Sequence, residues 1–161
     1  MTGITFTPIG TIYSPFKEPQ GTPIQAAASR EAKGWIDLLP EYQEGLEDLE
    51  GFSHLILLYQ FHLSPGFSLK VKPFLDDQPR GVFATRAPAR PNPIGFSVVC
   101  LERVEGRRLY IREMDIVDHT PLLDIKPYIP RFDSRAEARS GWLEKNLNKL
   151  DQVKDDGRFL K

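Results

Sequence analysis

The sequence predicts a mainly β protein whose strands form a single closed or strongly curved barrel, with short helical turns and a C-terminal α-helix. Runs rich in β-branched and aromatic residues outnumber helical patterns along the 161 residues. The sequence has no strand–helix–strand rhythm and no G-x-G-x-x-G motif, so a doubly wound sheet is not expected. A single domain spanning residues 1–161 is expected at this length.

Three strands are expected in the N-terminal half. The first covers the broken apolar alternation "ITFTPIGTIY", residues 4–13, and a proline-rich loop follows over residues 14–29. A short strand is expected in "GWIDLL", residues 34–39, and a helical turn over residues 41–51. That turn leads into "FSHLILLYQFHL", residues 52–63, which suits a buried strand, although the pattern alone also permits a helix.

The C-terminal half continues the β pattern. Residues 81–85 are strand-like, and residues 95–118 contain two strands joined by a hairpin turn at Glu105 and Gly106. A last strand is expected in "TPLLDIKPYIP", residues 120–130.

The tail of the chain, residues 134–155, has the pattern of an amphipathic α-helix. Ser134 and Glu137 form a capping box, and leucines recur at helical spacing.

Composition limits the kinds of site that are expected. The chain has 21 Lys and Arg against 22 Asp and Glu, so any basic surface must be local. Its single cysteine, Cys100, excludes a disulfide framework and favours the cytoplasm. No export signal or apolar run long enough to span a membrane is visible. Because His54, His62 and His119 lie far apart and no cysteine pair exists, no metal site is expected.

A rigid cationic loop stands out in "GVFATRAPARPNPIG", residues 81–95. Arg86 and Arg90 flank Pro88, and prolines also stand on both sides of Asn92. Proline fixes φ and restricts the preceding residue, so the polar groups of this loop are held in place before any ligand arrives. The alternative is a surface turn that uses proline for stability alone.

A second segment, "DIVDHTPLLDIKPY", alternates carboxylates with apolar residues. Because carboxylates are seldom buried without a partner, at least one of Asp115, Asp118 and Asp124 should meet an arginine or a backbone amide. A third segment, "YQFH" at residues 59–62, places aromatic rings and an imidazole at a strand end, where a core role is the simplest interpretation.

Taken together, these segments resemble the TrmO family, also called TsaA-like proteins. The resemblance is carried by "IGTIYSPF", "FSHLILLYQFH", "GVFATRAPARPNPIGFS" and "DIVDHTPLLDIKPYIP". Members are S-adenosylmethionine-dependent methyltransferases that modify N6 of threonylcarbamoyladenosine next to the tRNA anticodon. The resemblance implies a single-sheeted β-barrel, a homodimer with the methyl donor near the subunit interface, and tRNA as the substrate.

By position, the resemblance also implies the residues that contact S-adenosylmethionine. Arg86 would take the methionine carboxylate, Phe61 would face the ring or sulfonium, and the backbone around Thr120 would read an adenine edge. The full implied set is Gln25, Phe61, His62, Arg86, Ser97, Thr120, Pro121, Leu122 and Leu123.

The proton on the acceptor nitrogen needs a base, and Asp118 is preferred, with His62 and Tyr128 as further candidates, because of their places beside the donor motifs. Contacts to tRNA are expected from Arg90, Asn92 and Lys126, and a basic run at residues 107–112 either joins them or is an ordinary solvated strand face.

The sequence departs from the family pattern in ways that leave alternatives open. Around Gln25 the chain reads "IQAAAS", where many members have a proline and a glycine after the glutamine. "APARPN" replaces a Ser-Pro-His-Arg-Pro-Asn run, and His119 stands where glycine is common. Longer members carry an additional C-terminal domain. Two other functions therefore remain: a methyltransferase with a small-molecule acceptor, and a barrel that binds a nucleotide or RNA without catalysis.

Overall fold

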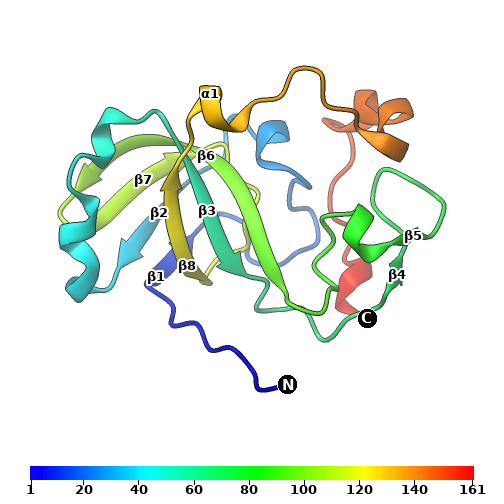
Figure 1. Ribbon diagram of the computed structural model, residues 1–161, viewed down its shortest axis with the longest axis horizontal. Coiled ribbons are helices and arrows are strands. Elements are labelled where there is room, and N and C mark those ends of the chain that lie inside the picture. Colours follow the sequence, from blue (N-terminus) through cyan, green and yellow to red (C-terminus); the bar gives the residue numbers. More distant parts are fainter.

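The computed structural model describes all 161 residues and confirms the mainly β fold (Figure 1). Six antiparallel strands close into a barrel in the order β1-β2-β7-β6-β3-β8. Their bounds are Gly10–Tyr13 for β1, Lys33–Leu38 for β2, His54–Gln60 for β3, Ile94–Glu105 for β6, Arg108–Arg112 for β7 and Thr120–Pro127 for β8. A two-stranded arm of β4, Lys70–Val71, and β5, Arg80–Gly81, lies beside the barrel (Figure 1).

The barrel interior is a packed apolar core. Alternate residues of the strands point inward, as the pleat requires, and together with Leu46, Met114 and Ile116 they form one buried cluster of 14 residues. Its fully buried members include Ile12, Ile36, Leu55, Leu57, Val99, Leu109, Ile111, Met114, Ile116 and Leu122. Because side chains fill the barrel, a ligand can bind only at its ends or outside it.

The run at residues 52–63 is a strand and not a helix. In β3 every second residue is buried, and the strand pairs along its length with both β6 and β8. The hairpin expected at Glu105 and Gly106 is also confirmed, since β6 ends at Glu105 and Gly106 adopts φ 60° in the turn. Cys100 is a buried free thiol.

Two expected strands are shorter than the sequence suggested. The first begins only at Gly10, because Pro8 interrupts the alternation and residues 4–8 are exposed. Residues 81–85 form mainly the 3₁₀ turn η4, Val82–Ala84, which the Thr85 hydroxyl closes by donating to the Val82 carbonyl.

The expected helix over residues 134–155 is wrong. The tail instead contains α1, Pro130–Asp133, and the 3₁₀ turns η5, Gly141–Lys145, and η6, Leu147–Lys149. Ser134 is extended and ends α1 instead of beginning a helix. Gly141 adopts φ 56°, which interrupts any helix there. The leucines of the pattern face an apolar cavity against the β4–β5 arm.

The remaining helical elements are also short. They are the 3₁₀ turns η1, Ala26–Ala28, η2, Pro40–Leu46, η3, Leu49–Gly51, and η7, Arg158–Leu160. The turns η2 and η3 account for the helical turn expected over residues 41–51. None of the helices has the length and apolar character needed to cross a membrane.

The glycine that ends the proline-arginine loop is required by packing. Gly95 lies opposite Tyr59 in the β3–β6 ladder, and the Tyr59 ring fills the space where a side chain at position 95 would point. We expect Gly95→Ala to displace this ring and lower the free energy of unfolding by about 1–3 kcal/mol. Gly81→Ala is the control, because its methyl group would meet open space. Equal urea-unfolding midpoints for the two variants would contradict this packing.

Candidate functional site

Antiparallel pairing brings three distant segments to one mouth of the barrel. Because β3 runs antiparallel to both β6 and β8, its C-terminal end lies beside the beginnings of those two strands. Gln60 pairs with Ile94, and Tyr59 pairs with Leu122. Phe61 and His62, the proline-arginine loop and the start of β8 therefore meet.

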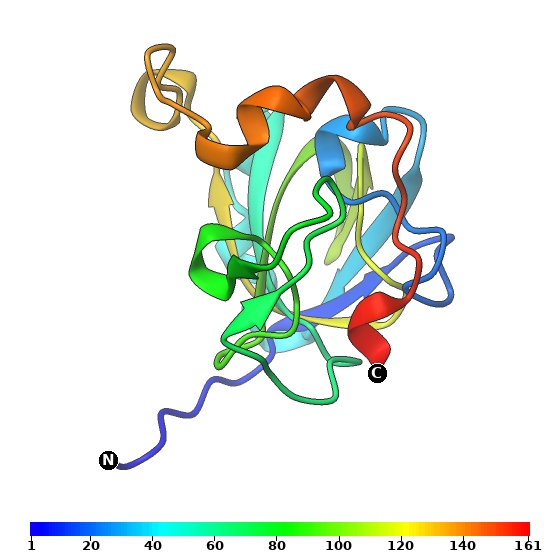
Figure 2. The same ribbon diagram turned by 90° about the vertical axis from the view of Figure 1, so that its right-hand side faces the viewer.

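A cavity of about 460 Å³ opens at this mouth, a volume typical of small-molecule sites. Its walls come from the loop after β1, the end of β3, the proline-arginine loop, the segment before β8 and the C-terminal tail, which passes in front of the barrel in Figure 2. The residues that line it include Gln25, Tyr59, Phe61, His62, Arg86, Arg90, Asp115, Thr120, Asp155 and Phe159.

The proline-arginine loop is held by its own hydrogen bonds. The Arg90 guanidinium donates to the carbonyls of Thr85 and Ala87, at 3.0 Å each. The Ala87 amide donates to the Thr85 hydroxyl. At the end of the loop, the Phe61 amide donates to the Pro93 carbonyl at 2.7 Å, which fixes the loop to β3. The rigidity expected from the prolines is therefore reinforced by polar contacts.

Arg86 presents a guanidinium that is positioned but not neutralised. It donates to the Gln25 side-chain carbonyl at 2.7 Å and lies 5.5 Å from the centre of the Phe96 ring. It forms no ion pair with a carboxylate. An unpaired guanidinium in a cavity is suited to a ligand carboxylate or phosphate.

A chain of hydroxyl groups leads to a carboxylate in the cavity wall. Ser97 donates to Asp115 at 2.6 Å, so the Tyr59 hydroxyl, 2.8 Å from Ser97, must donate to the Ser97 oxygen. Burial raises the pKa of Asp115 to about 6, although the Ser97 hydrogen bond opposes the shift. Burial and the nearby Asp115 charge raise the pKa of Tyr59, which stays protonated.

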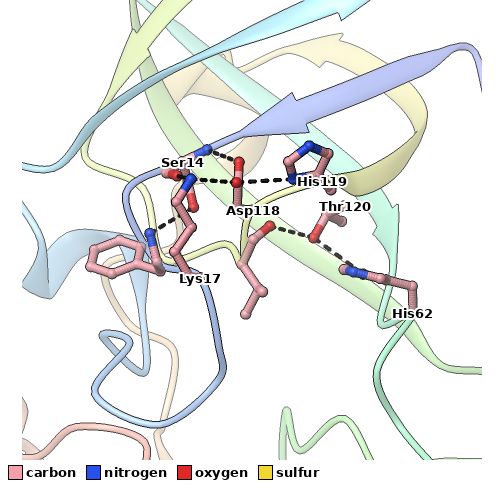
Figure 3. Close-up of polar contacts among 8 residues, drawn as sticks. Ser14, Lys17, His62, Asp118, His119 and Thr120 are labelled. Carbon is pink, nitrogen blue, oxygen red and sulfur yellow. Dashed lines mark hydrogen bonds and ion pairs between the residues drawn. The ribbon is translucent and has the colours of Figure 1, made fainter.

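His62 lines the cavity, and its ring lies beside Thr120 (Figure 3). The Thr120 hydroxyl donates to the Val117 carbonyl at 2.6 Å. The contact between Thr120 and His62 Nδ1 is longer, at 3.4 Å, and suits the tautomer that carries the proton on Nδ1 and leaves Nε2 as an acceptor. Burial lowers the pKa of His62, so the ring is neutral at pH 7.

Asp118 lies outside the cavity and braces the turn before β8 (Figure 3). It accepts a hydrogen bond from the Ser14 amide at 2.8 Å, forms an ion pair with Lys17 and lies 2.9 Å from His119 Nδ1. Burial alone would raise the pKa of Asp118, but the hydrogen bonds from Lys17 and Ser14 outweigh it and hold the pKa below its usual range. Asp118 thus meets a backbone amide, as does Asp124, which accepts from the Ile125 amide, and the sequence predicted such a partner for at least one of the three carboxylates.

Comparison with known proteins places this geometry in a family. The family model of the tRNA-methyltransferase O N-terminal domain matches residues 11–134. The chain belongs to the TrmO family. A Pyrococcus abyssi protein named as a probable S-adenosyl-L-methionine-binding protein is 56% identical over 157 residues, covering 98% of this chain and 85% of its own. The mouse tRNA (adenine(37)-N6)-methyltransferase is 36% identical, over 94% of this chain and 39% of its own.

Solved structures of TrmO have the same barrel. TrmO from Pseudomonas aeruginosa superposes with a TM-score of 0.75 at 44% identity, over 88% of this chain and 62% of that one. A second TrmO structure gives 0.76 at 46% identity, over 87% and 64%. The expected family and barrel are confirmed, and this chain spans less than two thirds of these longer TrmO chains.

The structure brings six of the predicted site residues to the cavity: Gln25, Phe61, His62, Arg86, Arg90 and Thr120. Ser97 does not line the cavity, but its hydroxyl donates a hydrogen bond to Asp115, which does. The rest of the expected donor turn does not line the cavity, because Leu122 is fully buried in the barrel core and Pro121 and Leu123 flank it on β8.

Tyr128 and Lys126 are too far away to act at this mouth. They lie at the other end of β8, and Tyr128 follows Thr120 by about 26 Å of extended strand. There the Tyr128 ring packs edge-on against His54, and Lys126 pairs with Asp124. Neither the preferred base, Asp118, nor the further candidate Tyr128 lines the cavity, since proximity in sequence to the donor motifs is not proximity in space.

The predicted RNA contacts are mostly used inside the protein. Arg90 braces its own loop, and Asn92 lies outside the cavity, where its carbonyl accepts from the Ile94 amide. In the basic run, Arg108 pairs with Asp37, and Arg112 pairs with Glu102 and Glu113. No group of three or more His, Cys, Asp or Glu side chains is arranged to hold a metal ion.

Among the cavity residues that sequence reasoning did not assign to the site, Asp115, Asp155 and Phe159 bear on its chemistry. Asp115 carried a signal, as a carboxylate among core residues, but was not assigned to the site. Asp155 and Phe159 gave no signal, because they reach the cavity only through the folded path of the tail.

The bracing role of Asp118 makes a stability prediction. Asp118→Ala should lower the free energy of unfolding at pH 7 by about 1–3 kcal/mol, because the Ser14 amide and Lys17 lose their buried acceptor. Since the folded-state pKa is lowered, this contribution is complete above the unfolded-state value of about 3.9 and is lost as pH falls through the folded-state pKa. Urea unfolding at pH 7 and pH 3 measures the difference.

Asp77→Ala is the control for this measurement, because Asp77 is an exposed carboxylate. Full stability of Asp118→Ala at pH 7 would remove Asp118 from its bracing role.

Proposed function

We propose that this chain is an S-adenosylmethionine-dependent tRNA methyltransferase that acts on N6 of threonylcarbamoyladenosine next to the anticodon. The single observation that carries the proposal is the cavity in which Arg86, Phe61 and His62 meet. Family membership supports the enzyme class and the cofactor, since relatives are named for S-adenosyl-L-methionine binding and for methylation of tRNA adenine 37 at N6.

The residues present fit S-adenosylmethionine. The cofactor carries an amino-acid carboxylate, a sulfonium cation, a ribose and an adenine. Arg86 supplies an unpaired guanidinium for the carboxylate, and the Phe61 ring and the Asp115 carboxylate supply groups that attract a cation. The cavity is large enough for most of such a ligand, and its rigid loop lowers the ordering cost of binding.

When bound, the cofactor would supply a methyl group on positively charged sulfur. The acceptor nitrogen would bond to the methyl carbon, in line with the carbon–sulfur bond that breaks. The residues of the chain contribute mainly orientation, an effect worth up to about 7–11 kcal/mol when reacting atoms are well aligned. Arg86 and the proline-arginine loop hold one partner in place, and the packed aromatic wall excludes water.

His62 replaces Asp118 as the proposed base. Its Nε2 is free and its ring is neutral at pH 7, whereas Asp118 is outside the cavity and already paired. The threonylcarbamoyl group makes the N6 proton more acidic than that of a plain adenine amine, so a modest base is sufficient. His62 Nε2 accepts this proton as the nitrogen forms its bond to the methyl carbon.

The internal pairing of Arg108 and Arg112 favours one second candidate, a methyltransferase with a small-molecule acceptor. Such an acceptor would not need a basic surface to hold phosphates.

Assembly and location complete the proposal. We infer a cytoplasmic homodimer, supported by the family and by large exposed apolar side chains such as Phe52 and Phe96. Sedimentation velocity at micromolar concentration tests the assembly, and a monomer that still binds donor would contradict it.

The acceptor is tested by incorporation of radioactive methyl groups into tRNA. We expect transfer to tRNA that carries threonylcarbamoyladenosine and no transfer to the same tRNA made without that modification, because only the modified base offers the acidic N6 proton. Nucleoside analysis by mass spectrometry identifies the product. Equal transfer to both tRNAs would contradict the proposed acceptor, and transfer to neither, with donor bound, would favour a small-molecule substrate.

The base is tested by the pH dependence of turnover. The rate should fall as pH drops below the pKa of free imidazole, about 6.5, because a protonated His62 cannot accept the proton and its own pKa is lowered. His62→Gln should lower turnover by roughly 10²–10⁴ and abolish this acid limb while leaving donor affinity nearly unchanged.

Asp115→Asn is the control for the pH profile, because Asp115, with a pKa of about 6, titrates in the same range. An acid limb that persists in His62→Gln and disappears in Asp115→Asn would assign the base to Asp115 instead.

A further inference from the structure

The last residues of the chain pair with the proline-rich loop after β1. The Gly21 amide donates to the Asp155 carbonyl at 2.6 Å, and the Asp155 amide donates to the Thr22 carbonyl at 2.9 Å. Pro23 and Lys154 form an isolated antiparallel bridge. Residues 151–161, which we name the C-terminal strap, thus add a short piece of sheet to that loop, as the adjacent red and blue segments of Figure 2 show.

The far end of the strap is anchored to the β4–β5 arm. The Arg158 guanidinium donates to the Lys72 and Pro73 carbonyls and lies 4.9 Å from the centre of the Phe74 ring. The Phe159 ring packs edge-on against Phe74, with centres 5.1 Å apart, and contacts the small apolar cluster of the arm. The strap is therefore fixed at both ends across one side of the cavity.

Asp155 lies in the cavity wall, and one of its carboxylate oxygens has no hydrogen-bond partner within the chain. Its Oδ1 accepts from the Gly157 amide at 2.7 Å, and its Oδ2 makes no hydrogen bond within the chain. The neighbouring Arg158 pairs with Asp156 and not with Asp155. Burial raises the pKa of Asp155, which is the behaviour of a carboxylate that lacks a cationic partner.

We propose that the C-terminal strap is part of the donor site and that Asp155 accepts hydrogen bonds from S-adenosylmethionine. The inference rests on the proposed function, and it adds a residue from beyond the family domain, which ends at residue 134. A carboxylate only accepts hydrogen bonds, so it selects the donor groups of its ligand. S-adenosylmethionine offers such groups at the α-ammonium, the ribose hydroxyls and the adenine amino group, all of which donate hydrogen bonds.

The test uses the full chain with Asp155→Asn. Asparagine keeps an oxygen for the Gly157 amide, so the turn of the strap is preserved while the charge is lost. We expect the affinity for S-adenosylhomocysteine, measured by calorimetry, to fall by about 10- to 100-fold. Asp151→Asn is the matched control, because Asp151 is an exposed carboxylate on the same strap, outside the cavity.

A second ligand, 5′-methylthioadenosine, distinguishes the ammonium from the other donors, because it has the ribose and adenine but no amino-acid part. If Asp155 binds the ribose hydroxyls or the adenine amino group, Asp155→Asn weakens both ligands equally. If it binds the ammonium, the variant weakens only S-adenosylhomocysteine. Unchanged affinity of Asp155→Asn for both ligands would overturn the role of the strap. Failure of the unmodified chain to bind either ligand would instead overturn the proposed function on which it rests.

Discussion

The site depends on the position of β3 between two antiparallel neighbours in the closed barrel. Pairing with β6 and β8 brings the end of β3 to the beginnings of both, so three segments that are separated in sequence form one wall. The packed interior excludes a ligand from the barrel itself. The candidate site residues meet in the cavity at this mouth. Any change that shifts β3 by one residue would turn Tyr59 out of the core and separate His62 from Thr120.

Around this fixed mouth, the chain holds charged groups without neutralising them. Arg86 is oriented by the neutral Gln25 amide, and Asp115 is oriented by the Ser97 hydroxyl. Hydroxyl and amide partners fix position while leaving the charge available to a ligand, whereas the ion pairs of Asp118 and Arg108 consume theirs. This contrast separates the groups that we propose for ligand recognition from those that stabilise the fold.

The sequence predicted the barrel, the hairpin at Gly106 and the family, because strand periodicity and long ordered motifs are local signals. Glycine is common in the family at position 119, and the structure gives a reason, because His119 adopts φ 62°, a conformation that glycine adopts more easily. The sequence could not predict that Tyr128 lies far from the mouth, that the tail forms no long helix, or that Asp155 reaches the cavity. Each of these depends on the path of the chain in space, which periodicity does not encode.

The strap closes one side of the cavity with residues beyond the family domain, and it supplies both an apolar wall and a carboxylate. The most direct test of the site is a crystal structure of the chain with S-adenosylhomocysteine. We predict the ligand in the barrel-mouth cavity with its carboxylate on Arg86. A ligand bound elsewhere, with the cavity empty and Arg86 held only by Gln25, would contradict the assignment.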